Sequence, residues 1–328
     1  MAVLDSSEKI GIYTVQNLIK ANRYTETYRI VDGDDHPFFL KVFLLGNIPT
    51  KLINQETRCV KEIEYSRQLH HRNIVSHVAD GRLEKESGSY QYYITDYFSG
   101  PVLADRLATG GKMSEEEAMP IFRNILVGLQ YMHAQATALC HNDLTPANIV
   151  LNDAMNGEAV IIDLGHTCTP CAGIAEFDTN DLDVLYHAKE TMVGIFDQQT
   201  DIFSACAILY TMLTGRAPWM IDVAPEGDYK ERFKAMWQYR QTHPLQTPDG
   251  ISPRSKRSSR KDSPSKPPTA SRPSMTSSPS SMTRNLSKNK AVSVPRKDEA
   301  RKEEAKERRT TMTCRWRSVA EAVTVSLT

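Results

Sequence analysis

One short segment constrains the fold of this 328-residue chain more than any other. It reads HNDLTPAN over residues 141–148, and a second acidic segment, DLG, begins at Asp163, 20 residues after Asp143. Two short strands are predicted between them, over 148–151 and 159–162, and the Asn-Gly pair that separates them is a strong signal for a hairpin turn. The pattern therefore predicts an amide and two carboxylates at the ends of adjacent strands.

These two carboxylates and one amide are the smallest set of side chains that phosphoryl transfer needs. A carboxylate such as Asp143 can accept the proton of an attacking hydroxyl, while Asn148 and Asp163 can hold Mg²⁺. Positioning and charge neutralisation supply most of the catalysis in such reactions. Each residue alone could be an ordinary turn residue, because Asp and Asn favour turns. Their joint spacing, with the hairpin and DLG, favours the functional interpretation.

Further segments in the same order resemble the protein kinase family, over about residues 10–245. The segment FFLK, which ends at Lys41, looks like the third-strand V-A-I-K motif of that family. The run from Lys61 to Val75 is similar to the family's C-helix and the loop after it. The resemblance implies that Lys41 binds the α- and β-phosphates of ATP and that Glu62 pairs with it.

The same resemblance implies the rest of the site. HNDLTPAN corresponds to the catalytic loop, with Asp143 as the catalytic base, and Asn148 and Asp163 would be the Mg²⁺ ligands. Thr95 would be the gatekeeper that precedes the hinge. The residues expected to bind the nucleotide or its metal are Lys41, Thr95, Asp96, Phe98, Asn148 and Asp163. ATP and Mg²⁺ are the implied cofactors.

Three later segments also fit the family. The segment AKE at 188–190 occupies the place of A-P-E, and Asp201 resembles the aspartate that anchors the catalytic-loop backbone. The segment GRAPW at 215–219 matches the G-x-x-P-aromatic turn that follows the next helix. These segments favour a protein substrate over a small molecule, and Pro146 leans towards Ser/Thr specificity. His141 is expected to be a packed, hydrogen-bonded histidine that supports the loop.

The chain departs from the family pattern in the phosphate-binding loop. That loop should lie within residues 20–28, yet Lys20, Asn22 and Thr25 stand where its three glycines belong. Glycines let backbone N–H groups approach phosphates closely, so side chains here should weaken the cradle. Phe39 replaces the small residue that faces the adenine and should narrow that pocket.

The catalytic loop departs from the pattern as well. Thr145 replaces the lysine or arginine that assists the transferring phosphate, and Asp183 falls where a threonine usually faces the catalytic aspartate. Together they remove a positive charge and add a negative one near the γ-phosphate, which should slow transfer. Asn142 replaces the arginine before the catalytic aspartate, so control by a phosphorylated activation loop is not expected.

Hydrophobic patterning agrees with an α+β, bilobal kinase-like fold. We expect a small β-rich N-lobe over 10–98 and a larger helical C-lobe over 99–249 that is incomplete, since the family's further helices are missing. The predicted elements include strands over 38–43, 74–79 and 90–97, a helix over 55–69, a helix that Ser114 and Glu117 open as a capping box, and a buried helix over 201–213.

The zero net charge of the chain hides two unlike parts. Residues 1–250 hold 21 basic and 33 acidic groups, whereas residues 251–310 hold 17 and 6, with 14 serines and no aromatic residue. Such a segment cannot bury enough apolar surface to offset the entropy of ordering. We expect a disordered basic tail over 250–328 that could end in a short helix, with Arg315 as the implied partner of Glu190. A shifted reading frame would produce the same abrupt change.

The most favoured function is an ATP- and Mg²⁺-dependent Ser/Thr protein kinase. One alternative is a pseudokinase, a binding or scaffold module with little or no transfer, and a second is a small-molecule phosphotransferase. The tail could contact acidic partners or the kinase lobe itself, although a solvated charge run is favoured; nucleic acid and membrane are not expected as partners. Irregularly spaced cysteines and the absence of a secretion signal at the start predict a cytoplasmic protein.

Overall fold

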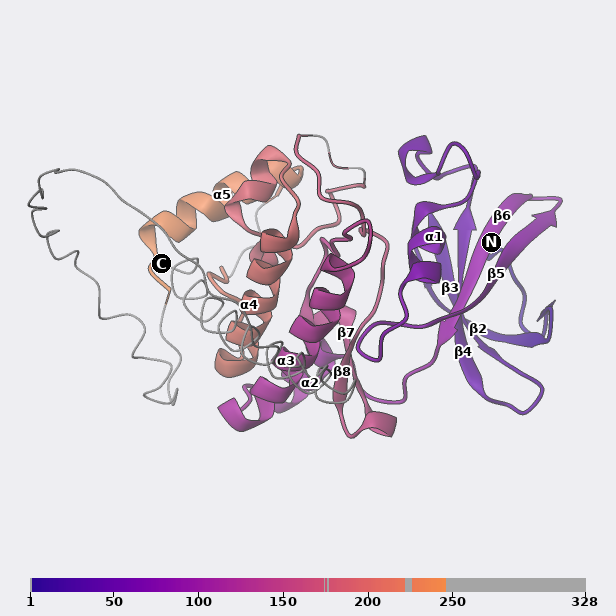
Figure 1. Ribbon diagram of the computed structural model, residues 1–328, viewed down its shortest axis with the longest axis horizontal. Helices are drawn as coiled ribbons and strands as arrows, with labels where there is room; N and C mark the ends of the chain where they lie inside the picture. The colour runs from indigo at the N-terminus through magenta and orange to yellow at the C-terminus, as the bar shows by residue number, and fades with distance from the viewer. Residues whose placement is uncertain (1, 174, 176, 222–225, 246–328) are drawn as a thin grey trace, which may run out of the picture. The chain divides into compact units, whose positions relative to one another are not determined.

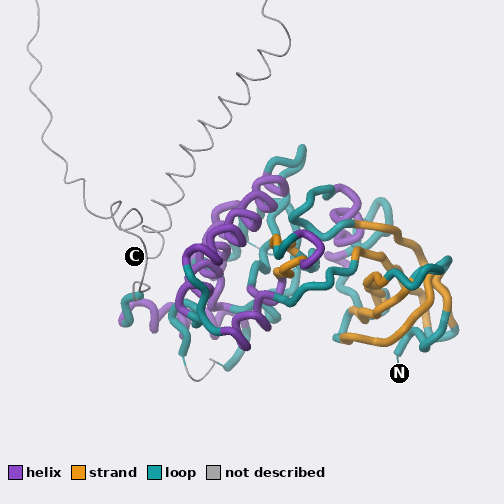
Figure 2. The backbone as a smooth tube through the Cα atoms, turned by 90° about the horizontal axis from the view of Figure 1, so that it is seen from below, coloured by secondary structure: helices purple, strands orange, loops and turns teal. Residues whose placement is uncertain are grey.

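The computed structural model describes residues 2–173, 175, 177–221 and 226–245. The chain divides into two compact units, Met1–Ile251 and Ser252–Thr328, and everything described here belongs to the first. The predicted tail over 250–328 lies outside the described residues. Within the first unit, strands gather at one end and helices at the other, as Figures 1 and 2 show. The bilobal α+β fold that the resemblance implied is confirmed, while its lobe boundaries stay predictions.

The N-lobe is an antiparallel six-stranded sheet in the order β1-β2-β3-β4-β6-β5. Its strands are β1 (Lys9–Ile10), β2 (Tyr13–Ala21), β3 (Thr25–Val31), β4 (Pro37–Leu44), β5 (His77–Lys85) and β6 (Gly88–Asp96). Alternate residues of β3 are buried, and Tyr28, Ile30 and Leu40 are fully inaccessible to solvent. One face of the sheet therefore forms the core of this lobe. Helix α1 (Lys61–Gln68) lies between β4 and β5 in the chain.

The C-lobe is mainly helical and contains one small hairpin. Its elements are α2 (Leu103–Gly110), α3 (Glu115–His133), β7 (Ile149–Asn152), β8 (Glu158–Ile161), α4 (Gln198–Thr214) and α5 (Tyr229–Thr242), with short 3₁₀ turns η2 (Pro146–Asn148), η3 (Asp153–Met155), η4 (Val184–Tyr186) and η5 (Lys189–Val193). Helix α3 packs against both α4 and β8. The hairpin β7–β8 thus joins the catalytic segments to the main helix (Figure 1). Within the described residues, no helix combines the length and the apolar character that crossing a bilayer requires.

The predicted start of α3 is confirmed. The side chain of Ser114 accepts a hydrogen bond from the Glu117 backbone N–H, and the Glu117 carboxylate accepts one from the Ser114 N–H. Asn156 and Gly157, the predicted hairpin signal, both have positive φ, at 56° and 77°. A positive φ suits Asn and Gly better than other residues, which explains why this pair lies between β7 and β8.

Two predicted elements were wrong at their ends. The helix predicted over 55–69 begins only at Lys61, because the preceding segment folds into a turn in which the Asn54 side chain accepts the backbone N–H of Glu56 at 2.9 Å. The strand predicted over 74–79 begins at His77 and continues to Lys85. The start of α1 also depends on a tertiary contact that hydrophobic patterning does not reveal: Val60, the residue before the helix, donates its N–H to Gln91 Oε1 at 2.9 Å.

Candidate active site

A cluster of three charged side chains lies where the two lobes meet. The Nζ of Lys41, on β4, donates to Glu62 Oε1 on α1 at 2.7 Å and to Asp163 Oδ1 after β8 at 3.0 Å. Tyr93 on β6 also donates to Glu62 Oε1, at 2.7 Å. The Lys41 and Glu62 side chains are only 17% and 7% exposed. The predicted pairing of Lys41 with Glu62 is thus present in the geometry, and Asp163 joins it.

The charges in this cluster stabilise one another. Burial opposes the positive charge of Lys41, but Asp163 and Glu62 outweigh it, so the pKa of Lys41 is raised. The Lys41 charge in turn lowers the pKa of Asp163, against the effect of burial. Burial, reinforced by the charge of Glu62, raises the pKa of Tyr93 well above its ordinary value. At neutral pH the cluster therefore holds the ammonium of Lys41 against the ionised carboxylate of Asp163.

The turn that carries Asp163 needs its glycine. Asp163 has φ 61°, a left-handed conformation, and its Oδ1 accepts the Gly165 backbone N–H at 3.2 Å. A Cβ at position 165 would lie 3.1 Å from that oxygen and 3.5 Å from Glu62 Oε2. A side chain there would crowd Oδ1 of Asp163, so the glycine of DLG helps to fix where Asp163 points.

Asp143 and Asn148 are held together at the start of the hairpin. The Asn148 Nδ2 donates to the backbone oxygen of Asp143 at 2.7 Å and to its Oδ2 at 2.9 Å. The 3₁₀ turn η2 brings the two residues into this contact, since Asn148 N also donates to Thr145 O at 3.0 Å. The Asp143 side chain is 16% exposed, so it retains access to solvent and to a ligand.

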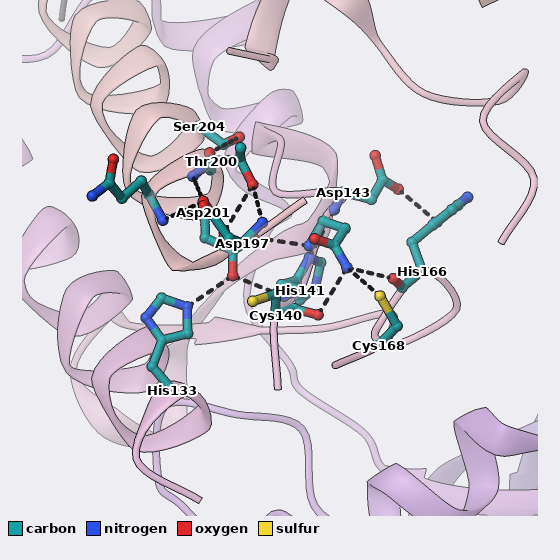
Figure 3. Close-up of polar contacts among 12 residues, drawn as sticks. His133, Cys140, His141, Asp143, His166, Cys168, Asp197, Thr200, Asp201 and Ser204 are labelled. Atoms are coloured by element: carbon teal, nitrogen blue, oxygen red, sulfur yellow. Dashed lines mark hydrogen bonds and ion pairs between the residues drawn. The ribbon is translucent and has the colours of Figure 1, made fainter. Parts of the chain in front are cut away.

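The backbone before Asp143 is anchored by Asp201 of α4. Its buried carboxylate accepts the N–H groups of His141 and Asn142, each at 2.9 Å, and contacts His133 Nε2 at 2.9 Å (Figure 3). Asn142 has φ 64°, an uncommon conformation for a residue other than glycine. The side chain of His141 is fully buried and contacts Ile162 O at 3.2 Å, as expected of a supporting histidine.

The residues of this site fit a Mg²⁺ ion. Lys41 and Gly165 both bond Oδ1 of Asp163, which leaves Oδ2 as a metal ligand, and the Asp163 side chain is 40% exposed. Both N–H groups of the Asn148 amide are used by Asp143, which leaves its Oδ1 for the same purpose. Carboxylate and amide oxygens are the ligands that hard cations prefer.

The cavity beside the cluster is capped by the β2–β3 turn. It is lined by Asn22, Thr25, Lys41, Glu62, Asp163 and His166, among others. Asn22 Oδ1 accepts the backbone N–H groups of Tyr24 and Thr25, each at 2.8 Å. In the family pattern this turn would offer such donors to phosphates, whereas here a side chain already uses them. Tyr24 OH also donates to Asp178 Oδ2 at 3.3 Å, which connects the turn to the segment after DLG.

Three predicted nucleotide-binding residues lie apart from this cavity. Within the described residues, the lining does not include Thr95, Asp96 or Phe98. Thr95 is buried in β6, opposite Phe39 of β4, and Phe98 packs against the cluster around Leu69 and Met132. The Phe39 ring lies 5.0 Å from that of Tyr97.

His166, the residue directly after DLG, was assigned no functional role from the sequence. Its Nδ1 lies 3.4 Å from Asp143 Oδ2, close enough for an ion pair. A histidine at this position was a visible signal, but its direction towards Asp143 depends on the fold. Asp183, which was expected near Asp143, has its pKa raised by desolvation and also by the Asp143 charge.

Arg240 of α5 holds the segment after Asp183. Its guanidinium donates to His187 O and to Val184 O, each at 2.9 Å, and lies 4.7 Å from the centre of the Trp219 ring. Burial lowers its pKa to about 10. Glu190, in the place of the A-P-E glutamate, contacts Lys189 at 4.0 Å, while its implied partner Arg315 lies outside the described residues.

Comparisons with known proteins agree on one family. A family model described as protein kinase domain matches residues 23–276. The chain is 31% identical over 176 residues to the probable serine/threonine-protein kinase MARK-C of Dictyostelium discoideum, which covers 52% of this chain and 22% of that protein. It is 29% identical over 230 residues to the carbon catabolite-derepressing protein kinase of Candida tropicalis, covering 64% and 35%. The chain thus spans about a fifth to a third of these relatives.

Proposed function

Since the chain belongs to the protein kinase domain family, we propose that it transfers the γ-phosphate of ATP, with Mg²⁺, to serine or threonine hydroxyls of proteins. The observation that carries this proposal is the joint placement of two groups of residues. Lys41, Glu62 and Asp163 form one ion cluster, and Asp143 with Asn148 forms the second group beside it. Every charged group that phosphoryl transfer requires, apart from the cation replaced by Thr145, is present.

Each residue has a role in the proposed reaction. Lys41, held by Glu62, binds the α- and β-phosphates, and Asp143 accepts the proton of the substrate hydroxyl. Asp163 and Asn148 would hold the metal ion, which when bound neutralises charge on the phosphate oxygens. Asp201 keeps the backbone on which Asp143 lies in position. Positioning and electrostatics, rather than covalent chemistry, supply the rate enhancement.

The serine/threonine preference rests on the relatives and on one residue. The Dictyostelium relative is named as a serine/threonine kinase, and Pro146 follows Thr145 in the catalytic loop. We also infer a cytoplasmic location, in keeping with the irregular spacing of the cysteines in the sequence. The tail over 250–328 is proposed to contact acidic partners or the kinase lobe itself, with a solvated charge run as the alternative.

A scaffold function with weak transfer is the second candidate. It is favoured by Asn22, whose side chain occupies the two N–H donors of the β2–β3 turn. Weak nucleotide binding would follow if the turn cannot release those donors to phosphate.

The test is phosphate transfer by the full chain. We would supply radiolabelled ATP and Mg²⁺, with the chain itself and a generic basic protein as acceptors, and identify the labelled amino acid after hydrolysis. Phosphoserine or phosphothreonine is expected, and Asp143→Asn should abolish it. Asp153→Asn, at an exposed aspartate of η3, is the matched control that should retain it. Phosphotyrosine alone would overturn the specificity, and absent transfer by the wild type would leave the scaffold function.

A further inference from the structure

The catalytic loop leaves Asp143 without the cation that the family pattern places in that loop. Thr145 stands there instead, 8% exposed and fixed by the bond from Asn148 N to its backbone oxygen at 3.0 Å. Desolvation, with a contribution from the Asp143 charge, raises the pKa of Asp183. Phosphoryl transfer spreads negative charge over the phosphate oxygens, so a neutral residue at this point should slow the reaction.

His166, in the turn after DLG, lies beside Asp143. Its Nδ1 is 3.4 Å from Asp143 Oδ2, and the two side chains are 19% and 16% exposed. Figure 3 shows the imidazole and the carboxylate facing each other. The turn that carries His166 is closed by the bond from Thr167 N to Leu164 O at 3.0 Å. The DLG turn that positions the metal ligand therefore positions this imidazole as well.

Two further contacts hold His166 in place. Its ring packs edge-on against Phe177, with ring centres 5.4 Å apart and an interplanar angle of 85°. Its backbone oxygen accepts the side-chain N–H of Asn142 at 2.9 Å. His166 also lines the cavity that contains Lys41 and Asp163. An imidazole fixed in this way faces both the catalytic carboxylate and the space proposed for the phosphates.

The charged and titratable groups around His166 come from every segment packed on it. They are Asp143 of the catalytic loop, Asp163 of its own turn, Lys41 of β4, His187 near η4, and Asp178 and Asp181 on the same cavity. Burial lowers the pKa of His166, but pairing with Asp143 and the Asp163 charge outweigh burial and Lys41, so the pKa is raised. Burial lowers the pKa of His187 to about 4, so that ring is neutral at neutral pH.

We propose that protonated His166 replaces the missing catalytic-loop cation. Its Nδ1–H faces Asp143 Oδ2 and orients that carboxylate, while its Nε2–H supplies positive charge to the transferring phosphate. The proton of the substrate hydroxyl still goes to Asp143, so His166 is not consumed in the reaction. This role rests on the proposed phosphotransfer function. In this proposal the turn after DLG supplies the positive charge that the catalytic loop lacks at Thr145.

The test removes the positive charge at position 166 and restores one at position 145. His166→Gln, which keeps the size and polarity of the side chain without its charge, should lower kcat at least about tenfold with a smaller change in the KM for ATP. Adding Thr145→Lys to His166→Gln should restore most of the lost rate, whereas Thr145→Lys alone should add little. Wild-type kcat should fall as pH rises through the raised pKa of His166, and the double variant should lose that dependence. Unchanged kcat in His166→Gln would overturn the proposal, as would a folded double variant without rescue.

A second readout does not depend on activity. The imidazole of His166 can be titrated by NMR in the full chain, in the wild type and in Asp143→Asn. We expect the pKa of His166 to fall in the variant, because it loses the carboxylate that stabilises the imidazolium. An identical pKa in both proteins would refute the pairing even if the chain transfers no phosphate. A lowered pKa in a chain without transfer would instead refute the proposed function and leave the pairing intact.

Discussion

The ion cluster of Lys41, Glu62 and Asp163 and the β2–β3 turn at Asn22 line the same cavity, but their polar groups are satisfied in different ways. The cluster neutralises its own charges and still leaves Asp163 Oδ2 for a ligand. The turn uses its N–H donors of Tyr24 and Thr25 on the Asn22 side chain. The charged groups of the site are therefore already in place for the proposed ligand, whereas the backbone donors of the turn have to exchange their partner before they can bind it.

The largest effect on activity is expected when the positive charge of Lys41 is removed from the cluster. Lys41→Met leaves the Glu62 and Asp163 carboxylates close together without the charge that holds down the pKa of Asp163. We expect kcat/KM to fall about 10²- to 10³-fold in a steady-state assay with ATP. Lys9→Met, at an exposed lysine of β1, should have no effect. A loss of similar size in Lys9→Met would mean that the assay reports stability rather than the site.

A smaller effect is expected when the partner of Lys41 is neutralised. Glu62→Gln keeps an oxygen for Lys41 and Tyr93 but removes a charge that raises the pKa of Lys41. We expect kcat/KM to fall about tenfold, since the hydrogen bond from the Lys41 ammonium loses its ionised acceptor. Glu64→Gln, two residues along α1, is the matched control. Equal activity in Glu62→Gln and the wild type would show that the pairing does not position Lys41.

In the β2–β3 turn, by contrast, a substitution at Asn22 should strengthen the binding of ATP. Asn22→Gly removes the side chain that occupies the Tyr24 and Thr25 N–H groups and frees them for phosphate. We expect the Kd for ATP with Mg²⁺ to fall by about two- to tenfold in calorimetry, because hydrogen bonds to charged groups outweigh the lost turn contact. Asn22→Asp, which keeps the acceptor and adds a negative charge, should bind ATP more weakly. Weaker binding by Asn22→Gly would mean that Asn22 orders the turn for its ligand.

The smallest effect is expected at the rim of the turn. Tyr24→Phe removes the hydrogen bond at 3.3 Å to Asp178 and keeps the ring. Such a bond between partly exposed groups contributes about 1 kcal/mol or less, so the Kd for ATP should change by less than about fivefold. Titration of the variant beside the wild type measures this directly. A larger change would indicate that contact between the turn and Asp178 controls entry to the cavity.

The charged side chains of the site could be predicted from the sequence far better than the backbone donors of the β2–β3 turn. Asp143, Asn148 and Asp163 could be picked out by their joint spacing, and Lys41 and Glu62 by the resemblance to the protein kinase family. The hydrogen bonds of Asn22 could not, since they depend on how a three-residue turn closes. In the fold, patterning located the strands and helices, but tertiary contacts moved the start of α1 to Lys61.

Other residues escaped prediction for the same physical reason. The direction of His166 depends on the turn after Asp163, and the buried position of Arg240 depends on carbonyl groups far away in the sequence. The expected nucleotide residues Thr95, Asp96 and Phe98 follow only from the resemblance, and they stay predictions. Spacing determines which segments come together, whereas side-chain direction is decided by packing.

The most direct test separates binding from chemistry at Asp143. We would measure the Kd for ATP with Mg²⁺ and, by rapid quench, the single-turnover rate of γ-phosphate transfer, in the wild type and in Asp143→Asn. Asp143→Asn should bind within about threefold of the wild type, yet lose the chemical step about 10²- to 10⁴-fold. Equal single-turnover rates would contradict Asp143 as the base. Tight binding with no transfer by the wild type would contradict the kinase function.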